Sequence, residues 1–364
     1  MSIVLITVLI ILFYKSKLAK NGFYRDECLS VATTTAIKGF FVLLILISHL
    51  GLFVKFNSLI DKPWILFIWQ LGQLIVTVFL FYGGYGIMES IKKKGDAYIK
   101  QIPVRRFFRV LFEFDLAVLL YLAFQNYIGT SYSGEIDYSV GNVIKAFFAI
   151  GNLGNPAWFI LCVLVHYLIA YASFRIFKDF RYALFAVGIL SVAYMIVCSI
   201  LLPVSDGRFY NTSICFFCGM VLSFYKEKIL TIYTKHYKKV IGLIIVAAGG
   251  RLLWYFAKGT LSSTVIVAYI DNLLYFPIYS ILFVFLILGV SLKVKFGNEV
   301  LDYLGNHVFS IYILQLLPMY ILRYLKIDEY NVYVFAFLAI IFALILAHFF
   351  EKLVAYLWNK LTNI

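Results

Sequence analysis

The chain has 364 residues, of which 63% are hydrophobic and only 14% are charged, and its mean hydropathy is +0.93. Soluble domains are about half apolar and carry charges on about a quarter of their residues, so this composition excludes an ordinary soluble domain. The apolar runs approach the roughly 20 residues that a helix needs to cross a bilayer, and they do not alternate as membrane-barrel strands do. We therefore expect an all-α polytopic membrane protein.

The predicted elements begin with a short hydrophobic helix at residues 2–14. No basic region precedes this run and no small-residue cleavage site follows it, so we expect a retained helix rather than a signal peptide. Residues 1–36 are assigned to this helix and a basic linker, and residues 37–364 to one membrane domain with a ten-helix core. The ten helices are expected at residues 37–54, 64–88, 107–127, 157–174, 182–202, 209–225, 240–257, 272–290, 308–322 and 332–358.

The net charge of +14 is distributed unevenly along the chain. If the linker before the first long helix is cytoplasmic, alternate connections place 24 of the 32 lysines and arginines on the cytoplasmic side. Inner loops of membrane proteins show this bias. It predicts a protein of the cell membrane with a cytoplasmic C-terminus, and it accounts for the basic composition without nucleic acid binding.

The first long helix carries two ionisable residues, Lys38 and His49, in a largely apolar run. Eleven residues turn an α-helix by about 1100°, so the two side chains share one face, roughly 16 Å apart along the axis. One interpretation is a snorkelling lysine and a packing histidine. The other is a functional path, because ionisable groups inside a membrane helix are costly and histidine accepts protons near neutral pH.

A second basic group follows the second long helix. Arg106 and Arg109 are three residues apart and share a helix face, with Arg105 beside them. Guanidinium groups bind phosphate through two parallel hydrogen bonds, which favours a phosphate ligand, and contact with lipid headgroups is the alternative. Glu113 lies one turn beyond Arg109 and is placed to pair with it.

Together these residues resemble the acyltransferase-3 family of integral membrane acyltransferases. The family pattern combines a basic residue and a histidine with ten residues between them, an Arg-x-x-Arg motif, a Gly-aromatic pair and a Trp-Phe pair. The corresponding residues here are Lys38 and His49, Arg106 and Arg109, Gly84 and Tyr85, and Trp158 and Phe159. The chain departs from the family in having Lys38 where arginine is common and Gly83 where serine is frequent.

The resemblance implies an O-acyltransferase that moves an acyl group, expected to be acetyl, from cytoplasmic acetyl-CoA or another acyl-CoA to a hydroxyl of an extracytoplasmic or cell-surface glycan. It implies that Arg106 and Arg109, assisted by Arg105, bind the CoA phosphates. The pantetheine arm would pass Lys38, and His49 would act as a general base or carry the acyl group itself. The expected partners are the acyl-CoA, the carbohydrate acceptor, membrane lipid, and a second copy or a separate extracytoplasmic transferase.

Three further residues are candidates for binding the acceptor. Trp158 falls near the outer membrane boundary, where an aromatic belt residue is the alternative. Arg251 lies inside a predicted helix, and Tyr85 follows Gly84, whose alternative role is helix packing. The five cysteines are expected to be inert buried thiols, and no metal is expected. The rival function for the whole chain is a membrane transporter or flippase for a glycan or small solute, because such proteins also place charges within the membrane.

Overall fold

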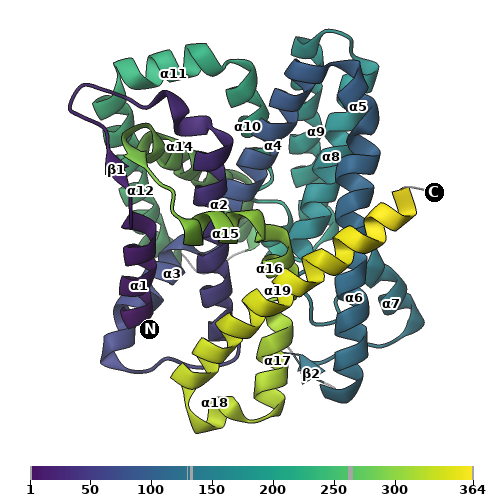
Figure 1. The fold of residues 1–364 in the computed structure, drawn as a ribbon. Coiled ribbons are helices and arrows are strands. Elements are labelled where there is room, and N and C mark those ends of the chain that lie inside the picture. Colours follow the sequence, from purple (N-terminus) through teal and green to yellow (C-terminus); the bar gives the residue numbers. More distant parts are fainter. Residues whose placement is uncertain (1, 129, 132–133, 261–264, 363–364) are drawn as a thin grey trace.

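The computed structural model describes residues 2–128, 130–131, 134–260 and 265–362, and it is predominantly helical (Figure 1). The all-α prediction is confirmed. The α-helices, in chain order, are α1 (Ser2–Phe13), α2 (Val31–His49), α3 (Lys62–Leu71), α4 (Leu74–Lys94), α5 (Asp96–Ile102), α6 (Arg109–Ile128), α7 (Val140–Phe147), α8 (Trp158–Ile176), α9 (Phe180–Leu201), α10 (Ile214–Phe224), α11 (Lys226–Lys235), α12 (Tyr237–Thr260), α13 (Val265–Ile270), α14 (Phe276–Lys293), α15 (Glu299–Asn306), α16 (Val308–Leu314), α17 (Leu316–Tyr324), α18 (Ile327–Tyr330) and α19 (Val332–Thr362).

Shorter elements join these helices. Two π-helical segments, η4 (Pro103–Phe108) and η6 (Asp271–Tyr275), continue directly into α6 and α14. The 3₁₀ segments are η1 (Asp26–Leu29), η2 (Leu50–Leu52), η3 (Leu59–Asp61) and η5 (Val204–Phe209). Two short antiparallel pairings join β1 (Lys17–Leu18) to β4 (Val294–Lys295) and β2 (Thr130–Ser131) to β3 (Gly134–Glu135).

Six helices in the described ranges are long and apolar enough to cross a membrane, and a seventh span arises if α15 and the bent helix after it count as one. The chain is therefore an integral membrane protein. The length and composition of its described helices support six or seven spans and do not show the ten that were predicted. Helix α10 has only 11 residues. Helix α6 carries Arg109, Glu113 and Asp115 in its first two turns. The segment predicted at 64–88 is divided into α3 and α4 at Gly72, whose φ is +46°.

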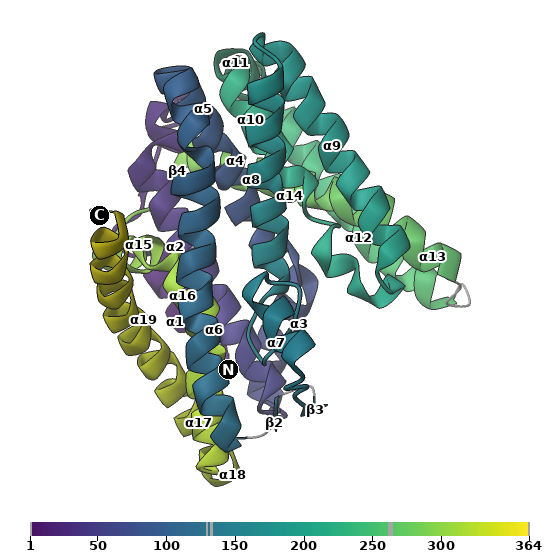
Figure 2. The same cartoon turned by 90° about the vertical axis from the view of Figure 1, so that its right-hand side faces the viewer.

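Helix α2, which carries both Lys38 and His49, is among the most enclosed of the candidate spans. Of its most apolar stretch, 72% is buried, against 28% for α9. Figure 2 shows α9, α12 and α13 leaning away from the other helices. A central helix held by neighbours on several sides fixes the direction of its side chains, and so the spacing between Lys38 and His49.

Close backbone contacts fix α2 against α15. A Cβ atom added to Gly39 would overlap the carbonyl oxygen of Leu301, and one added to Gly305 would overlap that of Thr35. The same reciprocal arrangement joins α4 to α10, where Gly84 faces the Phe216 carbonyl. The packing interpretation of Gly84 is therefore confirmed, because small residues allow membrane helices to approach this closely.

The segment from α15 to α17 contains two breaks. The axis turns by 66° between α15 and the helix that begins at Val308. A second break separates α16 from α17 at Gln315. Pro318 accounts for this break, because proline has no N–H to donate to the carbonyl of Leu314 and its ring crowds that carbonyl.

Helix α1 packs against α3 and α15. The Asn298 side-chain amide donates to the carbonyls of Ile11 (2.8 Å) and Tyr14 (3.1 Å), and Lys15 pairs with Glu299 at 2.5 Å. Its 12 residues extend about 18 Å, which is shorter than the hydrocarbon core of a bilayer. The N-terminal helix predicted at residues 2–14 is thus attached to the C-terminal third of the chain.

Candidate active site

A basic pocket lies where the ends of α4, α5 and α19 meet the η4–α6 junction. Its volume, measured as the space open to the centre of a water molecule, is about 540 Å³. The π-helical turn of η4 matters here, because π segments inside helices are frequent at functional sites. All three arginines predicted to bind phosphate line this pocket. The complete set of lining residues is Ser90, Lys94, Tyr98, Val104, Arg105, Arg106, Arg109, Trp358 and Thr362.

Two of the three arginines are held by aromatic side chains. The Nε atom of Arg106 donates to the hydroxyl of Tyr98 at 3.0 Å. The guanidinium of Arg109 lies 4.9 Å from the ring centroid of Trp358, a cation–π distance. Neither contact neutralises the positive charge. Both leave guanidinium N–H groups free to bind an anion, since each guanidinium has five.

The cations of this region have no carboxylate partner within the described residues. No Asp or Glu there forms an ion pair with Lys38, Lys94, Arg105, Arg106 or Arg109. By contrast, Arg175 and Lys100 outside the pocket both pair with Asp96, at 3.2 Å and 2.8 Å. The hydrogen bond from Lys100 holds the pKa of Asp96 below its ordinary value, so that carboxylate stays charged. These cations carry no matching negative charge, and Lys38, Arg106 and Arg109 are partly buried, which favours binding of a polyanion.

The predicted pairing of Glu113 with Arg109 is wrong. Glu113 instead accepts a hydrogen bond of 3.0 Å from Ser310 on α16, whose hydroxyl is also 3.1 Å from Glu351 on α19. Glu351 in turn lies 3.3 Å from His307 at the α15–α16 break. This cluster ties α6, α16 and α19 together, because a polar group inside a membrane bundle finds partners on neighbouring helices.

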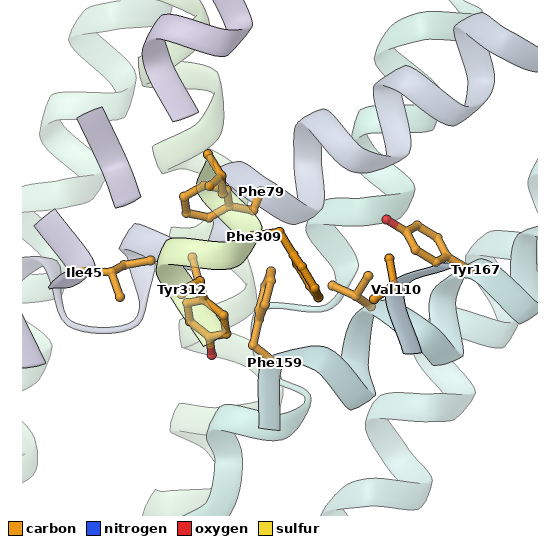
Figure 3. Close-up of a pocket in the computed structure, with 10 residues that line it drawn as sticks. Ile45, Phe79, Val110, Phe159, Tyr167, Phe309 and Tyr312 are labelled. Atoms are coloured by element: carbon orange, nitrogen blue, oxygen red, sulfur yellow. The ribbon is translucent and has the colours of Figure 1, made fainter. Parts of the chain in front are cut away.

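A second, apolar cavity lies among α2, α4, α6, α8 and α16 (Figure 3). Its volume by the same measure is about 130 Å³. Aromatic rings form a ladder along it, with Phe159 at 6.3 Å from Phe79 and 5.4 Å from Tyr312 between ring centroids. The lining residues are Ile45, Val76, Phe79, Val110, Phe159, Val163, Tyr167, Val308, Phe309 and Tyr312.

The basic pocket and the apolar cavity adjoin each other. Arg109 lines the first and its chain neighbour Val110 lines the second. Arg106, in the basic pocket, interacts electrostatically with the phenol of Tyr167, which lines the cavity. The charge of Arg106 also acts on Lys38. Lys38 lines neither hollow, but it lies within electrostatic range of Arg106 and on the α2 face that also carries Ile45.

His49 lies near the Ile45 side of the cavity, which Figure 3 shows across from Val110 and Tyr167. It is the last residue of α2, one turn beyond the lining residue Ile45. Its Nδ1 atom is buried and has no hydrogen-bond partner in the described part of the chain. The fully buried side chain of Gln315 lies beside the imidazole. The apolar cavity thus has the basic pocket near its Val110 side and His49 near its Ile45 side.

The remaining candidates are placed differently. Trp158 is half-buried at the start of α8, next to the cavity residue Phe159. Tyr85 is buried on α4 where that helix packs against α10, and it lines neither hollow. The side chain of Arg251 lies outside the described residues. Among the residues that the structure describes, no cluster of three or more His, Cys, Asp or Glu side chains is arranged to hold a metal ion.

Sequence reasoning missed Tyr98, Tyr167 and Gln315. The chain has 28 tyrosines, so nothing in the sequence distinguished Tyr98 and Tyr167 from the others. Gln315 did carry one, because it is a polar residue in an apolar run three positions before Pro318. The argument used for His49, that polar groups within a membrane helix are costly and functional, applies to it equally.

A family model described as an acyltransferase domain, that of acyltransferase 3, matches residues 34–350. The helical membrane fold is therefore that of a membrane acyltransferase, which uses an acyl donor and an acyl acceptor. The chain belongs to the acyltransferase-3 family. No curated protein and no solved structure matches it.

Proposed function

We propose that the protein transfers an acyl group, most simply acetyl, from cytoplasmic acyl-CoA to a hydroxyl of an extracytoplasmic or cell-surface glycan. The observation that carries this proposal is the succession of a basic pocket with Arg106, the neighbouring cation Lys38, the apolar cavity and then His49. Each part matches a chemically different part of an acyl-CoA molecule.

The phosphates of CoA suit the basic pocket. CoA carries a diphosphate and a ribose phosphate, and the pocket offers Arg105, Arg106, Arg109 and Lys94 without competing carboxylates among the described residues. Arginine binds phosphate with directed parallel hydrogen bonds, and lysine adds charge. The two half-buried cations Lys38 and Arg106 repel each other, and an anion between or beside them relieves that repulsion.

The pantetheine arm and the acyl group suit the apolar cavity. The arm is a thin, largely apolar chain, and the cavity that begins at Tyr167 is lined mainly by Val, Ile, Phe and Tyr. Ile45 and Tyr312 lie at the end nearest His49, so a chain that fills the cavity presents its thioester to the imidazole. The narrow cavity must widen as the arm enters, which side-chain rotation of its aromatic residues permits.

His49 supplies the chemistry under this proposal. As a general base, it takes the proton of the acceptor hydroxyl while the oxygen attacks the thioester carbon. The C–S bond then breaks, and the CoA thiolate takes the proton from the imidazolium. Alternatively, the imidazole attacks first, releases CoA and passes the acyl group to the hydroxyl in a second step. Both routes convert thioester and alcohol into ester and thiol.

The proposed sidedness rests on the charge bias of the sequence. That bias puts the basic pocket and the C-terminus on the cytoplasmic side, with ten spans in the cell membrane. Trp158, beside the cavity residue Phe159, is the candidate that best suits stacking on a sugar acceptor. A second copy of the chain, or a separate extracytoplasmic transferase, would then receive or complete the product.

The test uses detergent-purified protein and acetyl-CoA labelled in the acetyl group, with cell-envelope extract as a source of acceptor. Thiol release and label on protein or glycan are scored for wild type, His49→Ala and His166→Gln. His166 is a matched control, because it is also buried in a membrane helix but contacts Tyr194 and Phe216 rather than either hollow. We expect release and transfer in wild type and His166→Gln and none in His49→Ala. Absence of CoA binding in wild type would favour a transporter.

A further inference from the structure

Gln315 occupies an unusual position in the bundle. It lies at the break between α16 and α17, and its side chain is fully buried at 0% exposure. A primary amide in such a place needs partners, because a polar group that is buried without a hydrogen bond destabilises the fold. The Pro318 break places this residue at the end of the cavity wall that α16 forms, one turn beyond Tyr312.

One hydrogen bond fixes which way the amide points. The Nε2 group of Gln315 donates to the carbonyl of Tyr312 at 2.9 Å. A carbonyl can only accept, so the nitrogen must face Tyr312 and the oxygen must face away. That oxygen, Oε1, is buried and has no hydrogen-bond partner among the described residues. Gln315 therefore offers one oriented acceptor to its surroundings.

The imidazole of His49 beside it also has a ring nitrogen without a hydrogen-bond partner among the described residues. The Nδ1 atom of His49 is buried and has no partner in the described residues. The two side chains lie side by side but short of hydrogen-bond geometry. Catalytic hydrogen bonds are often long or poorly aligned without substrate and tighten when it binds. A hydrogen bond between the Gln315 Oε1 and the His49 Nδ1 would satisfy both atoms at once.

We propose that Gln315 is a positioning residue for His49, an inference that rests on the proposed function. Its Oε1 accepts a hydrogen bond from the Nδ1–H group of His49. This bond holds the neutral imidazole in the tautomer whose Nε2 carries the lone pair. Nε2 is then the atom that takes the hydroxyl proton or attacks the thioester. The group that orients a catalytic histidine decides which nitrogen reacts.

An amide suits this role in a membrane better than a carboxylate. Carboxylates orient histidine in many soluble sites, but a second ionised group beside the imidazole would have to be desolvated. Gln315 accepts the same hydrogen bond without a charge, and its own N–H is already satisfied by Tyr312. The arrangement orients the ring at little electrostatic cost.

The kinetic test compares Gln315→Leu, which removes the acceptor but keeps the bulk, with Gln315→Glu, whose carboxyl, kept neutral by burial, retains a donor to Tyr312 and an acceptor oxygen. We expect Gln315→Leu to lower kcat by about 10- to 100-fold, the cost of losing a hydrogen bond to a group that becomes charged, with KM for acetyl-CoA within about twofold. Gln315→Glu should retain most of kcat. Gln101→Leu, on the exposed face of α5, is the control and should match wild type.

A second readout does not depend on turnover. Protein labelled with ¹⁵N-histidine contains five histidines, and the His49 signal is identified by its loss in His49→Gln. We expect the ¹⁵N spectrum to show a protonated Nδ1 in wild type and in Gln315→Glu, and a shift toward protonated Nε2 in Gln315→Leu.

The outcomes separate the two proposals. Full kcat in Gln315→Leu, or equal losses in Gln315→Leu and Gln315→Glu, would overturn the positioning role while leaving acyl transfer intact. A wild-type protein without any acyl transfer would overturn the proposed function, and the tautomer measurement would still decide what Gln315 does. An unchanged His49 tautomer in Gln315→Leu would overturn the positioning role of Gln315 in either case.

Discussion

The basic pocket and the region around His49 differ in charge, size and polarity. In the basic pocket, Lys94, Arg105, Arg106 and Arg109 line a space of about 540 Å³. Near His49, an apolar cavity of about 130 Å³ leads to one imidazole and one amide. Under the proposed function, binding and chemistry are separated: the charges gather where water reaches them, and the proposed reacting group lies where water is scarce.

The largest expected effect comes from removing the imidazole. His49→Ala should lower single-turnover acyl transfer by about 10²- to 10⁴-fold, the usual contribution of a general base. The Kd for CoA should stay within about twofold, because the basic pocket is unchanged. Isothermal titration with CoA and rapid-quench transfer measure the two quantities. A large loss of CoA affinity in His49→Ala would mean that the two regions are not separate.

The complementary change is Arg106→Ala in the basic pocket. Charge-assisted hydrogen bonds are worth about 1.5–3 kcal/mol, so the Kd for CoA should rise by about 10- to 100-fold. The rate at saturating acyl-CoA should change little. Arg175→Ala is the matched control, since it removes the same charge but pairs with Asp96 outside the pocket. Equal effects of the two arginine variants on the Kd for CoA would mean that the positive charge of the surface, and not the pocket, determines CoA binding.

Some of the features that these variants test could be predicted from the sequence, and others could not. The shared face of Lys38 and His49 follows from the helical period alone, and the arginine group lies within five consecutive residues, so both were predictable. The cavity was not, because its lining comes from five helices and its residues are individually unremarkable. The Ser310 partner of Glu113 is 197 residues away, and no local rule points to it. The place of Gln315 depends on the two breaks between α15 and α17.

The cavity itself can be tested through the length of the acyl chain. Phe79→Ala removes one ring of the ladder that passes through Phe159 to Tyr312. We expect the ratio of kcat/KM for butyryl-CoA to that for acetyl-CoA to rise by about tenfold, in the range that one or two methylenes contribute. Phe108→Ala, on an exposed ring, is the control. A ratio that does not move would place the acyl group elsewhere.

The smallest expected effect concerns the support of Arg106. Tyr98→Phe deletes the hydroxyl that accepts from its Nε atom at 3.0 Å. We expect the Kd for CoA to rise by about three- to tenfold, since a single hydrogen bond contributes about 1 kcal/mol. The double variant Tyr98→Phe/Arg106→Ala should bind no more weakly than Arg106→Ala alone. Additive losses would show that the hydroxyl contacts CoA independently.

The central claim is that an acyl group enters at the basic pocket and leaves at the His49 end. The most direct measurement supplies labelled acetyl-CoA to the cytoplasmic face of inside-out membrane vesicles that enclose cell-envelope glycan. We predict labelled glycan in the lumen and free CoA outside, both lost in His49→Ala and reduced in Arg106→Ala at limiting acetyl-CoA. Label that appears only when CoA and glycan share one side of the membrane would contradict the claim.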